Sequence, residues 1–423
     1  MSVESKKNKR NSSSTPANPR RVAWNCLQRW EQGGVFAETL IAQSATALSA
    51  QNRALVQALV LGTLRNLRWL RHLCDALRNG RLESSARWLI LLGLCQLYVL
   101  HKPNHAAVSE TVSLAPPRFR GLVNGVLRSA VARREEFEDE VSRLSPGIRY
   151  SMPDWLVQRW CAEFGEQEAE KMLAWNVQTP PVYARINPLN PPEIGADWQA
   201  LSDIPGWYRL PAGGLPMDDL KNGRIYVADP STRHSVRLLA PQPGERVLDA
   251  CAAPGGKSVA MLGATHGDIE LLATDAEEHR LPQLRENLQR AGGRNIAVQL
   301  HDWSSPCPQQ WQGRFDAVLL DVPCSNSGVL QRRVDARWRL QPNEFERLAD
   351  LQLRIISCAA AAVRPGGRLV YSTCSIDRQE DRAVVEAFLS THTDFRLVED
   401  YLALPHREQA DGAYAALLLK QEY

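Results

Sequence analysis

Two cysteines stand where apolar, strand-like segments end, and side chains of this type at this position could carry out chemistry. Cys324 follows the apolar residues 315–322, and Cys374 follows residues 368–372. A thiolate is both a good nucleophile and a good leaving group, which suits covalent catalysis in two steps. A single cysteine in a chain with nine is most simply a buried, inert thiol. Two thiols at the ends of neighbouring strands point instead to a shared site.

A glycine-containing turn, residues 250–257 (ACAAPGGK), joins a predicted strand to a predicted helix. A Walker A loop requires a glycine where this chain has Cys251, and a dinucleotide fingerprint requires Gly-x-Gly-x-x-Gly where only the adjacent Gly255 and Gly256 are present. Both patterns fail where the backbone must approach a phosphate. The turn therefore suits a ligand with less phosphate than the nucleotides that these two patterns bind.

Three aspartates end the second, third and fourth predicted strands of the same region: Asp275, Asp302 and Asp321. Asp275 follows Gly256 at the spacing, roughly 20 residues, at which an acidic side chain commonly binds a ribose diol. Each aspartate alone is most simply a helix cap or a turn residue. Three carboxylates at successive strand ends favour a nucleoside that carries positive charge elsewhere, and S-adenosylmethionine, a sulfonium, fits that description.

Beside a methyl donor, a cysteine thiolate predicts a particular reaction. Carbon 5 of a cytosine is a poor nucleophile, but a thiolate that adds to carbon 6 makes the ring enamine-like and able to accept a methyl group. Loss of the carbon-5 proton and expulsion of the thiolate then complete the exchange. The residues thus favour methylation of cytosine at carbon 5.

From residue 244 onward, strand-like and helical segments alternate, and they must position these side chains. The predicted strands are 246–249, 270–275, 296–302, 315–322, 368–372 and 413–419, and the predicted helices after the first are 278–291, 343–363 and 378–390. Repeated βα units predict a parallel, doubly wound sheet with ligands at the carboxyl ends of its strands.

The preceding part of the chain has a different pattern. Apolar residues recur at three- and four-residue steps through residues 52–77, and further helices are predicted at 84–99, 106–114 and 119–134, which indicates an all-helical bundle. An acidic run at 135–140 predicts a break between this bundle and the next part of the chain. Beyond it, a helix at 153–175 and strand-like pieces at 182–186 and 224–227 predict a small α/β connecting domain.

Charge is distributed unevenly along the chain. The net charge is only +3, yet residues 1–134 hold 20 basic and 6 acidic residues, which leaves 30 basic and 41 acidic residues for the remainder. Sixteen of those 20 are arginines, which recognise phosphate through a planar, bidentate group. The alternative is a solvated helix face. The distribution predicts that the amino-terminal part of the chain binds a polyanion.

Three segments resemble the signature motifs of the RNA cytosine-5 methyltransferase family: 249–258 (DACAAPGGKS), 321–325 (DVPCS) and 372–375 (STCS). Residues 103–110 (PNHAAVSE) and 121–128 (GLVNGVLR) resemble the NusB-like RNA-binding fold. The resemblance implies a multidomain protein: a disordered basic tail (1–19), an all-α NusB-like RNA-binding bundle (20–141), a small α/β connecting domain (142–235) and an α/β Rossmann-like, S-adenosylmethionine-dependent methyltransferase domain (236–423). This fusion occurs in bacterial 16S rRNA methyltransferases of the family, which implies a specific cytosine of 16S rRNA as the substrate.

Carried over residue by residue, the resemblance implies roles for the site. Cys374 is the nucleophile, Cys324 assists product release, and Asp321 lies between the cofactor and the cytosine. Asp275 takes the ribose hydroxyls and Asp302 the adenine side. The methionine end of S-adenosylmethionine is wrapped by Cys251, Ala252, Ala253, Pro254, Gly255, Gly256 and Lys257. Related DNA enzymes attack with the cysteine of their Pro-Cys pair, so the swapped assignment is the mechanistic alternative.

The chain departs from the family pattern at two places. Asn326-Ser327-Gly328 stands where Gly-Thr-Gly is usual, although asparagine tolerates a positive φ. Residues 228–231 (ADPS) stand where relatives often carry Gln-Asp. The functional alternatives are a methyltransferase for a different RNA, a DNA cytosine methyltransferase and a non-catalytic, NusB-like RNA-binding factor.

Several features bound the location and the partners. The polar and basic start of the chain, residues 1–20, is unlike a secretory signal. The most apolar run, 88–100, is too short to span a membrane, which takes about 20 residues. Without any Cys-x-x-Cys pair, we expect reduced thiols rather than disulfides or a structural zinc site. We expect a cytoplasmic protein that binds neither membrane nor metal and acts as a monomer.

Overall fold

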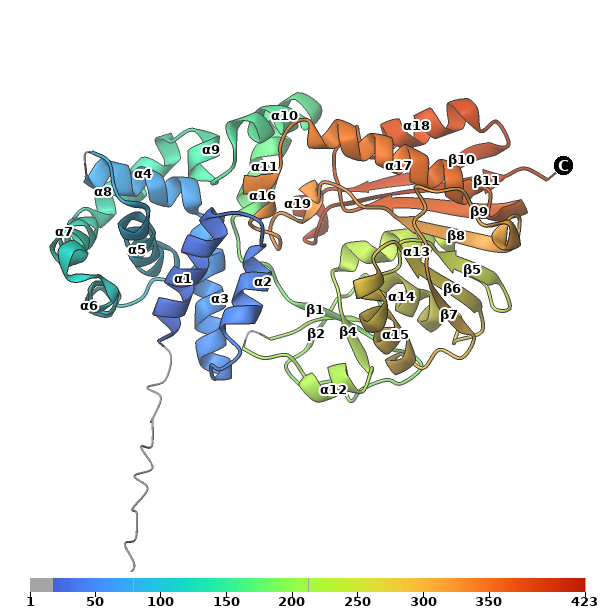
Figure 1. The fold of residues 1–423 in the computed structure, drawn as a ribbon, viewed down its shortest axis with the longest axis horizontal. Helices are drawn as coiled ribbons and strands as arrows, with labels where there is room; N and C mark the ends of the chain where they lie inside the picture. The colour runs from blue at the N-terminus through green and yellow to red at the C-terminus, as the bar shows by residue number, and fades with distance from the viewer. Residues whose placement is uncertain (1–17, 79, 212, 423) are drawn as a thin grey trace, which may run out of the picture. The chain divides into compact units, whose positions relative to one another are not determined.

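A computed structural model gives the fold and describes residues 18–78, 80–211 and 213–422 (Figure 1). The chain forms two compact units, residues 1–154 and residues 155–423. The tail predicted at 1–19 lies outside the described residues except for its last two, and residue 19 already begins a helix. Within the described ranges, every helix is too short or too polar to cross a membrane.

The first unit is helical, as predicted. Its first helix begins where the side chain of Asn18 accepts hydrogen bonds from the backbone of Arg20 and Arg21, with proline in the first turn. The helices are α1 (Pro19–Glu31), α2 (Ala37–Ser44), α3 (Ala50–Arg65), α4 (Leu67–Leu77), α5 (Ser84–Leu94), α6 (Asn104–Leu114), α7 (Pro117–Ala132), α8 (Arg134–Glu140) and α9 (Pro146–Arg149), with a π-helical turn at Cys95–Val99 and a 3-10 turn at Val141–Arg143.

Two sequence predictions need correction in this unit. The periodic segment 52–77 is two helices rather than one, because the chain breaks at Asn66, whose buried side chain donates to the carbonyl of Gly62. The acidic run at 135–140 is a helix rather than a break, because Phe137 on its inner face is buried and the carboxylates occupy the exposed face.

The second unit begins with a small α/β region, as predicted, although the helix predicted at 153–175 is two helices, which Gly165 separates with a positive φ. Its four strands form an antiparallel sheet in the order β2-β3-β1-β4. A small core of Ala184, Leu210 and Ile225 lies against this sheet. The elements are α10 (Asp154–Phe164), α11 (Glu166–Asn176), β1 (Tyr183–Ile186), β2 (Gln199–Ala200), β3 (Trp207–Arg209), α12 (Met217–Lys221) and β4 (Ile225–Val227).

The remainder forms a seven-stranded sheet in the order β10-β11-β9-β8-β5-β6-β7. Neighbouring strands from β9 to β7 in this order run parallel. The strands are β5 (Arg246–Asp249), β6 (Glu270–Asp275), β7 (Ile296–Leu300), β8 (Phe315–Asp321), β9 (Val363–Thr373), β10 (Phe395–Ala403) and β11 (Ala413–Lys420). The strand order reverses direction between β5 and β8, where ligands bind in doubly wound sheets.

Helices cover both faces of this sheet (Figure 1). One apolar cluster joins α17 and α18 to one face, and a second joins α13, α14 and α15 to the other. The helices are α13 (Arg233–Leu239), α14 (Gly256–Ala264), α15 (Leu281–Arg290), α16 (Ala336–Arg339), α17 (Glu344–Ala360), α18 (Arg382–Thr391) and α19 (Pro405–Glu408), with short 3-10 turns at Pro230–Thr232, Glu278–Arg280, Gln309–Trp311 and Ser327–Val329.

The sheet differs from the predicted one at one edge. The final strand, β11, was expected to run parallel but pairs antiparallel with β9, and β10, which the sequence did not indicate, pairs antiparallel with β11. The strand β10 lies at the edge of the sheet, and its charged residues Arg396, Glu399 and Asp400 interrupt the apolar alternation that would have marked a strand.

Candidate active site

The turn between β5 and α14 places a buried carboxylate beneath the site. Asp249 ends β5 fully buried, and its Oδ2 accepts a hydrogen bond of 2.5 Å from Ser258 Oγ. Its Oδ1 has no hydrogen-bond partner among the described residues. Burial raises the pKa of Asp249 to about 7. Gly255 makes the sharp turn into the helix with a positive φ, which a residue with a Cβ rarely adopts.

Two cavities open at the carboxyl ends of the parallel strands and share part of their lining. The strand-end cavity, about 390 Å³, is lined by Asp275, Asp302, Pro323, Leu351 and Ile355, among others. The cysteine cavity, about 350 Å³, is lined by Cys374, Lys257, Asp249, Asn326 and Arg332, among others. The residues that line both cavities are Cys251, Ala253 and Asp321.

The predicted nucleoside-binding aspartates line the strand-end cavity. Buried Asp275 accepts backbone hydrogen bonds from Ala253 (3.1 Å) and Glu277 (3.0 Å). Exposed Asp302 accepts one from Ser304 at 2.8 Å. Both aspartates therefore stabilise turns, which is the simpler explanation of an aspartate at a strand end, and both also line the cavity.

The two predicted reactive cysteines are brought together. The Sγ atoms of Cys324 and Cys374 lie 3.0 Å apart, and Cys374 Sγ also donates to Asn326 Oδ1 at 3.3 Å. The hydrogen bond that the Cys324 thiol donates to Cys374, together with burial, raises the pKa of Cys324 well above its usual value. Asn326 adopts a positive, left-handed φ, so asparagine does replace glycine in this turn as the sequence predicted.

An ion pair lies at the lining that the two cavities share. Lys257 Nζ donates to Asp321 Oδ2 at 2.6 Å. Burial by itself would lower the pKa of Lys257, but the negative charge of Asp321 outweighs it and the pKa is raised. The ammonium group therefore remains charged beside Asp321.

The glycine-containing loop is divided between the cavities. Cys251 and Ala253 line both of them, whereas Ala252, Pro254, Gly256 and Lys257 line the cysteine cavity. Gly255 shapes the turn. A role of the entire loop in binding the methionine end of a cofactor therefore stays a prediction.

Sequence reasoning missed a second charged group that lines the cysteine cavity. Arg332 donates to Asp229 Oδ2 at 2.7 Å and to Asp411 Oδ2 at 2.9 Å. The three residues come from segments far apart in the chain. Asp229 lies in residues 228–231, where relatives often carry Gln-Asp, but nothing in the sequence connected it to Arg332 or Asp411.

A buried glutamate, also missed, ties the two cysteine-bearing turns together. Glu380 Oε1 accepts hydrogen bonds from Ser325 N (2.8 Å) and Gln352 Nε2 (3.0 Å), and Oε2 accepts one from Ser375 Oγ (2.8 Å). Ser325 follows Cys324 and Ser375 follows Cys374. The only sequence signal was the closeness of Glu380 to the Thr-Cys-Ser segment. One carboxylate thus holds both turns.

Comparisons with known proteins decide the family. Residues 236–419 match the family described as 16S rRNA methyltransferase RsmB/F, residues 17–132 match the NusB family, and residues 152–191 match the RsmF/B-like ferredoxin-like domain. The ribosomal RNA small subunit methyltransferase B of Vibrio cholerae is 35% identical to this chain, over 96% of the chain and 98% of its own length. The chain belongs to the ribosomal RNA small subunit methyltransferase B family.

Membership of this family makes the chain a methyltransferase and confirms the predicted fold class. The ribosomal RNA small subunit methyltransferase B of Serratia proteamaculans is 34% identical over 95% of this chain and 99% of its own length. The crystal structure of PH0851 has the same fold, with a TM-score of 0.76 at 22% identity over 96% of this chain and 99% of that one. The NusB-like bundle, the small ferredoxin-like domain and the Rossmann-like sheet are all present.

Proposed function

We propose that the chain transfers a methyl group from S-adenosylmethionine to carbon 5 of one specific cytosine in 16S rRNA, through a covalent adduct with Cys374. The observation that carries this proposal is the lining that the strand-end and cysteine cavities share: a cofactor bound in the first and a base bound in the second would lie on either side of Asp321. The relatives named as ribosomal RNA small subunit methyltransferases support the choice of substrate.

The strand-end cavity fits S-adenosylmethionine in its chemistry. Asp275 offers carboxylate oxygens to the ribose hydroxyls, and Leu351 and Ile355 offer apolar surface to the flat adenine, with Asp302 on the same side. The aspartates also complement a positive sulfonium. When bound, the cofactor supplies an electrophilic methyl group beside the shared lining.

The cysteine cavity supports the covalent part of the reaction. The thiolate of Cys374 forms a bond to carbon 6 of the cytosine, and the electron pair of the ring double bond makes carbon 5 nucleophilic. After carbon 5 has been methylated, it gives its proton to a base, which can be a water molecule, and the electrons of that C–H bond re-form the double bond. The bond between sulfur and carbon 6 breaks, and its electrons return to Cys374. Cys324, 3.0 Å away, assists this release.

The target base must leave any helical stack to reach these cavities. Enzymes that modify a base act on single strands or flip the nucleotide out of a duplex. An unpaired or flipped cytosine in the cysteine cavity would place its ring beside Cys374 and Asp321. We accordingly propose looped or single-stranded rRNA as the target, met in the cytoplasm by a monomeric enzyme.

Transfer of labelled methyl groups tests the proposal. The full chain is incubated with labelled S-adenosylmethionine and naked 16S rRNA, assembled 30S subunits or DNA, and the labelled nucleotide is mapped. Label at carbon 5 of one cytosine in either RNA sample is the expected result. Label in DNA alone, or an RNA that binds without being methylated, would contradict the proposal and favour one of the alternatives.

A further inference from the structure

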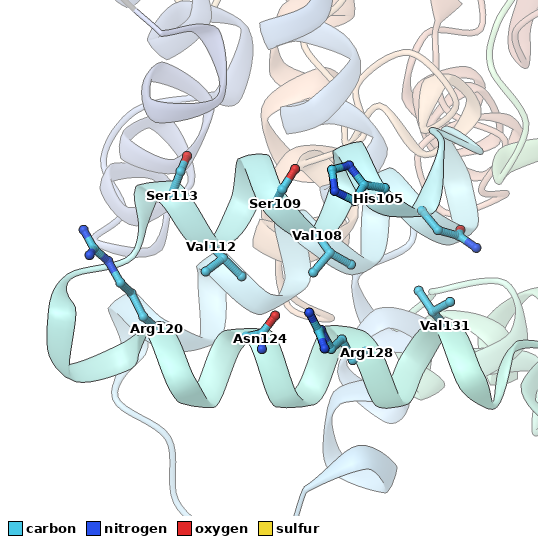
Figure 2. A pocket seen from close by; sticks show the side chains of 10 residues that line it. His105, Val108, Ser109, Val112, Ser113, Arg120, Asn124, Arg128 and Val131 are labelled. Atoms are coloured by element: carbon cyan, nitrogen blue, oxygen red, sulfur yellow. The ribbon is translucent and has the colours of Figure 1, made fainter.

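A groove between α6 and α7 of the first unit, lined by apolar, polar and basic side chains, has no role in the reaction described above. The groove encloses about 680 Å³. Figure 2 shows side chains of both helices pointing toward one another across the space between them. Val108, Val112 and Val131 form its partly buried floor. The remaining residues that line it carry polar or basic side chains.

The basic side chains of the groove belong to one stripe of α7. Arg120, Asn124 and Arg128 recur at four-residue intervals, which places them on one face of the helix. The two arginines are eight residues apart and therefore about 12 Å apart along the helix axis. On α6, Val108 and Val112 point toward this stripe, and the more exposed His105 and Ser109 also belong to the lining of the groove (Figure 2). The groove thus carries two separated positive charges with the amide of Asn124 between them.

These side chains are free to bind a ligand. None of the residues that line the groove is acidic. Arg120 uses only its Nε, which donates to the carbonyl of Ala115, so both of its terminal nitrogens remain available. Neither Asn124 nor Arg128 makes a side-chain hydrogen bond or ion pair with another described residue. An exposed pair of guanidinium groups without carboxylate partners complements a chain of phosphates.

We propose that the groove between α6 and α7 binds a single-stranded segment of the RNA substrate. Arg120 and Arg128 contact phosphates that are not adjacent, Asn124 contacts a base edge, and the valine floor contacts ribose or base. A duplex is recognised across a broad surface by its shape, whereas a narrow groove with both donors and acceptors suits unstacked bases. The inference rests on the proposed function, because it assumes that the substrate is RNA.

Binding of RNA oligonucleotides to the full-length double variant Arg120→Ala/Arg128→Ala tests this proposal. We expect the Kd for a single-stranded 16S rRNA segment to rise at least 10-fold at about 0.1 M salt. The slope of log K against log salt should fall by about 1.4, since each contact to a phosphate of a single strand contributes about 0.7. The KM for RNA should rise while kcat at saturating RNA is unchanged.

A matched control lies on the same helix. Arg118→Ala removes an exposed arginine that pairs with Glu83 at 2.9 Å and does not line the groove, so the Kd should stay within twofold. Asn124→Ala should weaken binding without changing the salt slope. An equal loss of RNA affinity in Arg118→Ala would overturn the proposal, and so would an unchanged Kd and salt slope in the double variant. A double variant that loses binding to an acidic peptide but still binds RNA would overturn it as well. Because binding is measured without methyl transfer, failure of the proposed function would be seen separately as RNA that the wild type binds but does not methylate.

Discussion

The Sγ atoms of Cys324 and Cys374 lie 3.0 Å apart, although 50 residues separate them in the chain. Their strands, β8 and β9, are parallel neighbours in which Asp321 pairs with Ser372. Both strands therefore end at the same edge of the sheet, and each continues into a turn that carries one cysteine. The short distance is a consequence of strand order. It places the two thiols in direct contact within one site.

The two cysteines should give opposite results when each is replaced. Cys374→Ala should abolish methyl transfer and form no covalent complex, because it lacks the attacking thiolate. Cys324→Ala should retain attack but fail to release the product, so that protein linked to RNA accumulates. Denaturing gels with labelled RNA measure both outcomes. Cys161→Ala, a half-buried thiol on α10, is the control and should behave as the wild type. A trapped complex in Cys374→Ala would reverse the assignment.

Removing the charge of Asp321 should change the neighbouring lysine as well as the reaction. In Asp321→Asn, burial is left without the opposing negative charge, so the pKa of Lys257 should fall below its usual 10.5. Methyl transfer should fall about 100-fold, a loss of roughly 3 kcal/mol of transition-state stabilisation. Reductive methylation of lysines with labelled formaldehyde, followed by NMR titration, measures the pKa. Asp316→Asn, at the other end of β8, is the control; an unchanged Lys257 pKa would disprove the coupling.

Glu380 should act on the reaction through the two turns that it connects. In Glu380→Gln, one carboxylate oxygen is replaced by an amide donor, which leaves at least one of the three donors without an acceptor at a cost of about 1–3 kcal/mol. We expect adduct formation in the Cys324→Ala background to slow by about 10-fold or more, with little change in RNA affinity. Glu386→Gln, an exposed glutamate on α18, should leave that rate unchanged. Equal rates in the two variants would show that Glu380 does not position the cysteines.

The buried Asp249 should make the stability of the second unit depend on pH. Its pKa is about 7 in the folded chain and near 3.8 when exposed, so the unfolded state loses the proton first and stability falls as pH rises from about 4 to 7. Asp249→Asn removes this loss. The free energy of unfolding of the variant should exceed that of the wild type by nearly zero at pH 4 and by about 4 kcal/mol at pH 7, and the difference should stay constant above pH 7.

Thermal unfolding across this pH range measures that gain, and Asp316→Asn supplies a control of opposite sign. Burial opposes ionisation of Asp316, but the hydrogen bonds that it accepts from Arg246 and Arg364 outweigh burial and lower its pKa. The Asp316 carboxylate therefore stabilises the fold above about pH 4, and Asp316→Asn should lower the free energy of unfolding at neutral pH. A gain from Asp249→Asn that does not change between pH 4 and 7 would show that Asp249 is not protonated in the folded chain.

Local patterns in the sequence determined much of this protein. The recurrence of apolar residues at three- and four-residue steps predicted the helical first unit. Six strands were predicted for the large sheet, and five of them have the predicted direction. The motifs supplied Cys324, Cys374 and Asp321, and the strand pattern placed Asp275 at the end of a strand and Asp302 within two residues of one. The existence of β10 could not be predicted, since charged residues interrupt its apolar alternation. The direction of β11 could not be predicted either, since its partner β9 is remote in sequence.

Only the tertiary structure decided how these residues meet. That Cys324 contacts Cys374, that Glu380 holds both turns, and that Arg332 joins Asp229 to Asp411 all depend on which strands are neighbours and on side chains from separate segments. Such contacts have no local signature, because hydrogen bonds act over about 3 Å in space regardless of separation along the chain. The sequence determined which chemical groups are available at the strand ends, and the order of strands in the sheet determined which of them act together.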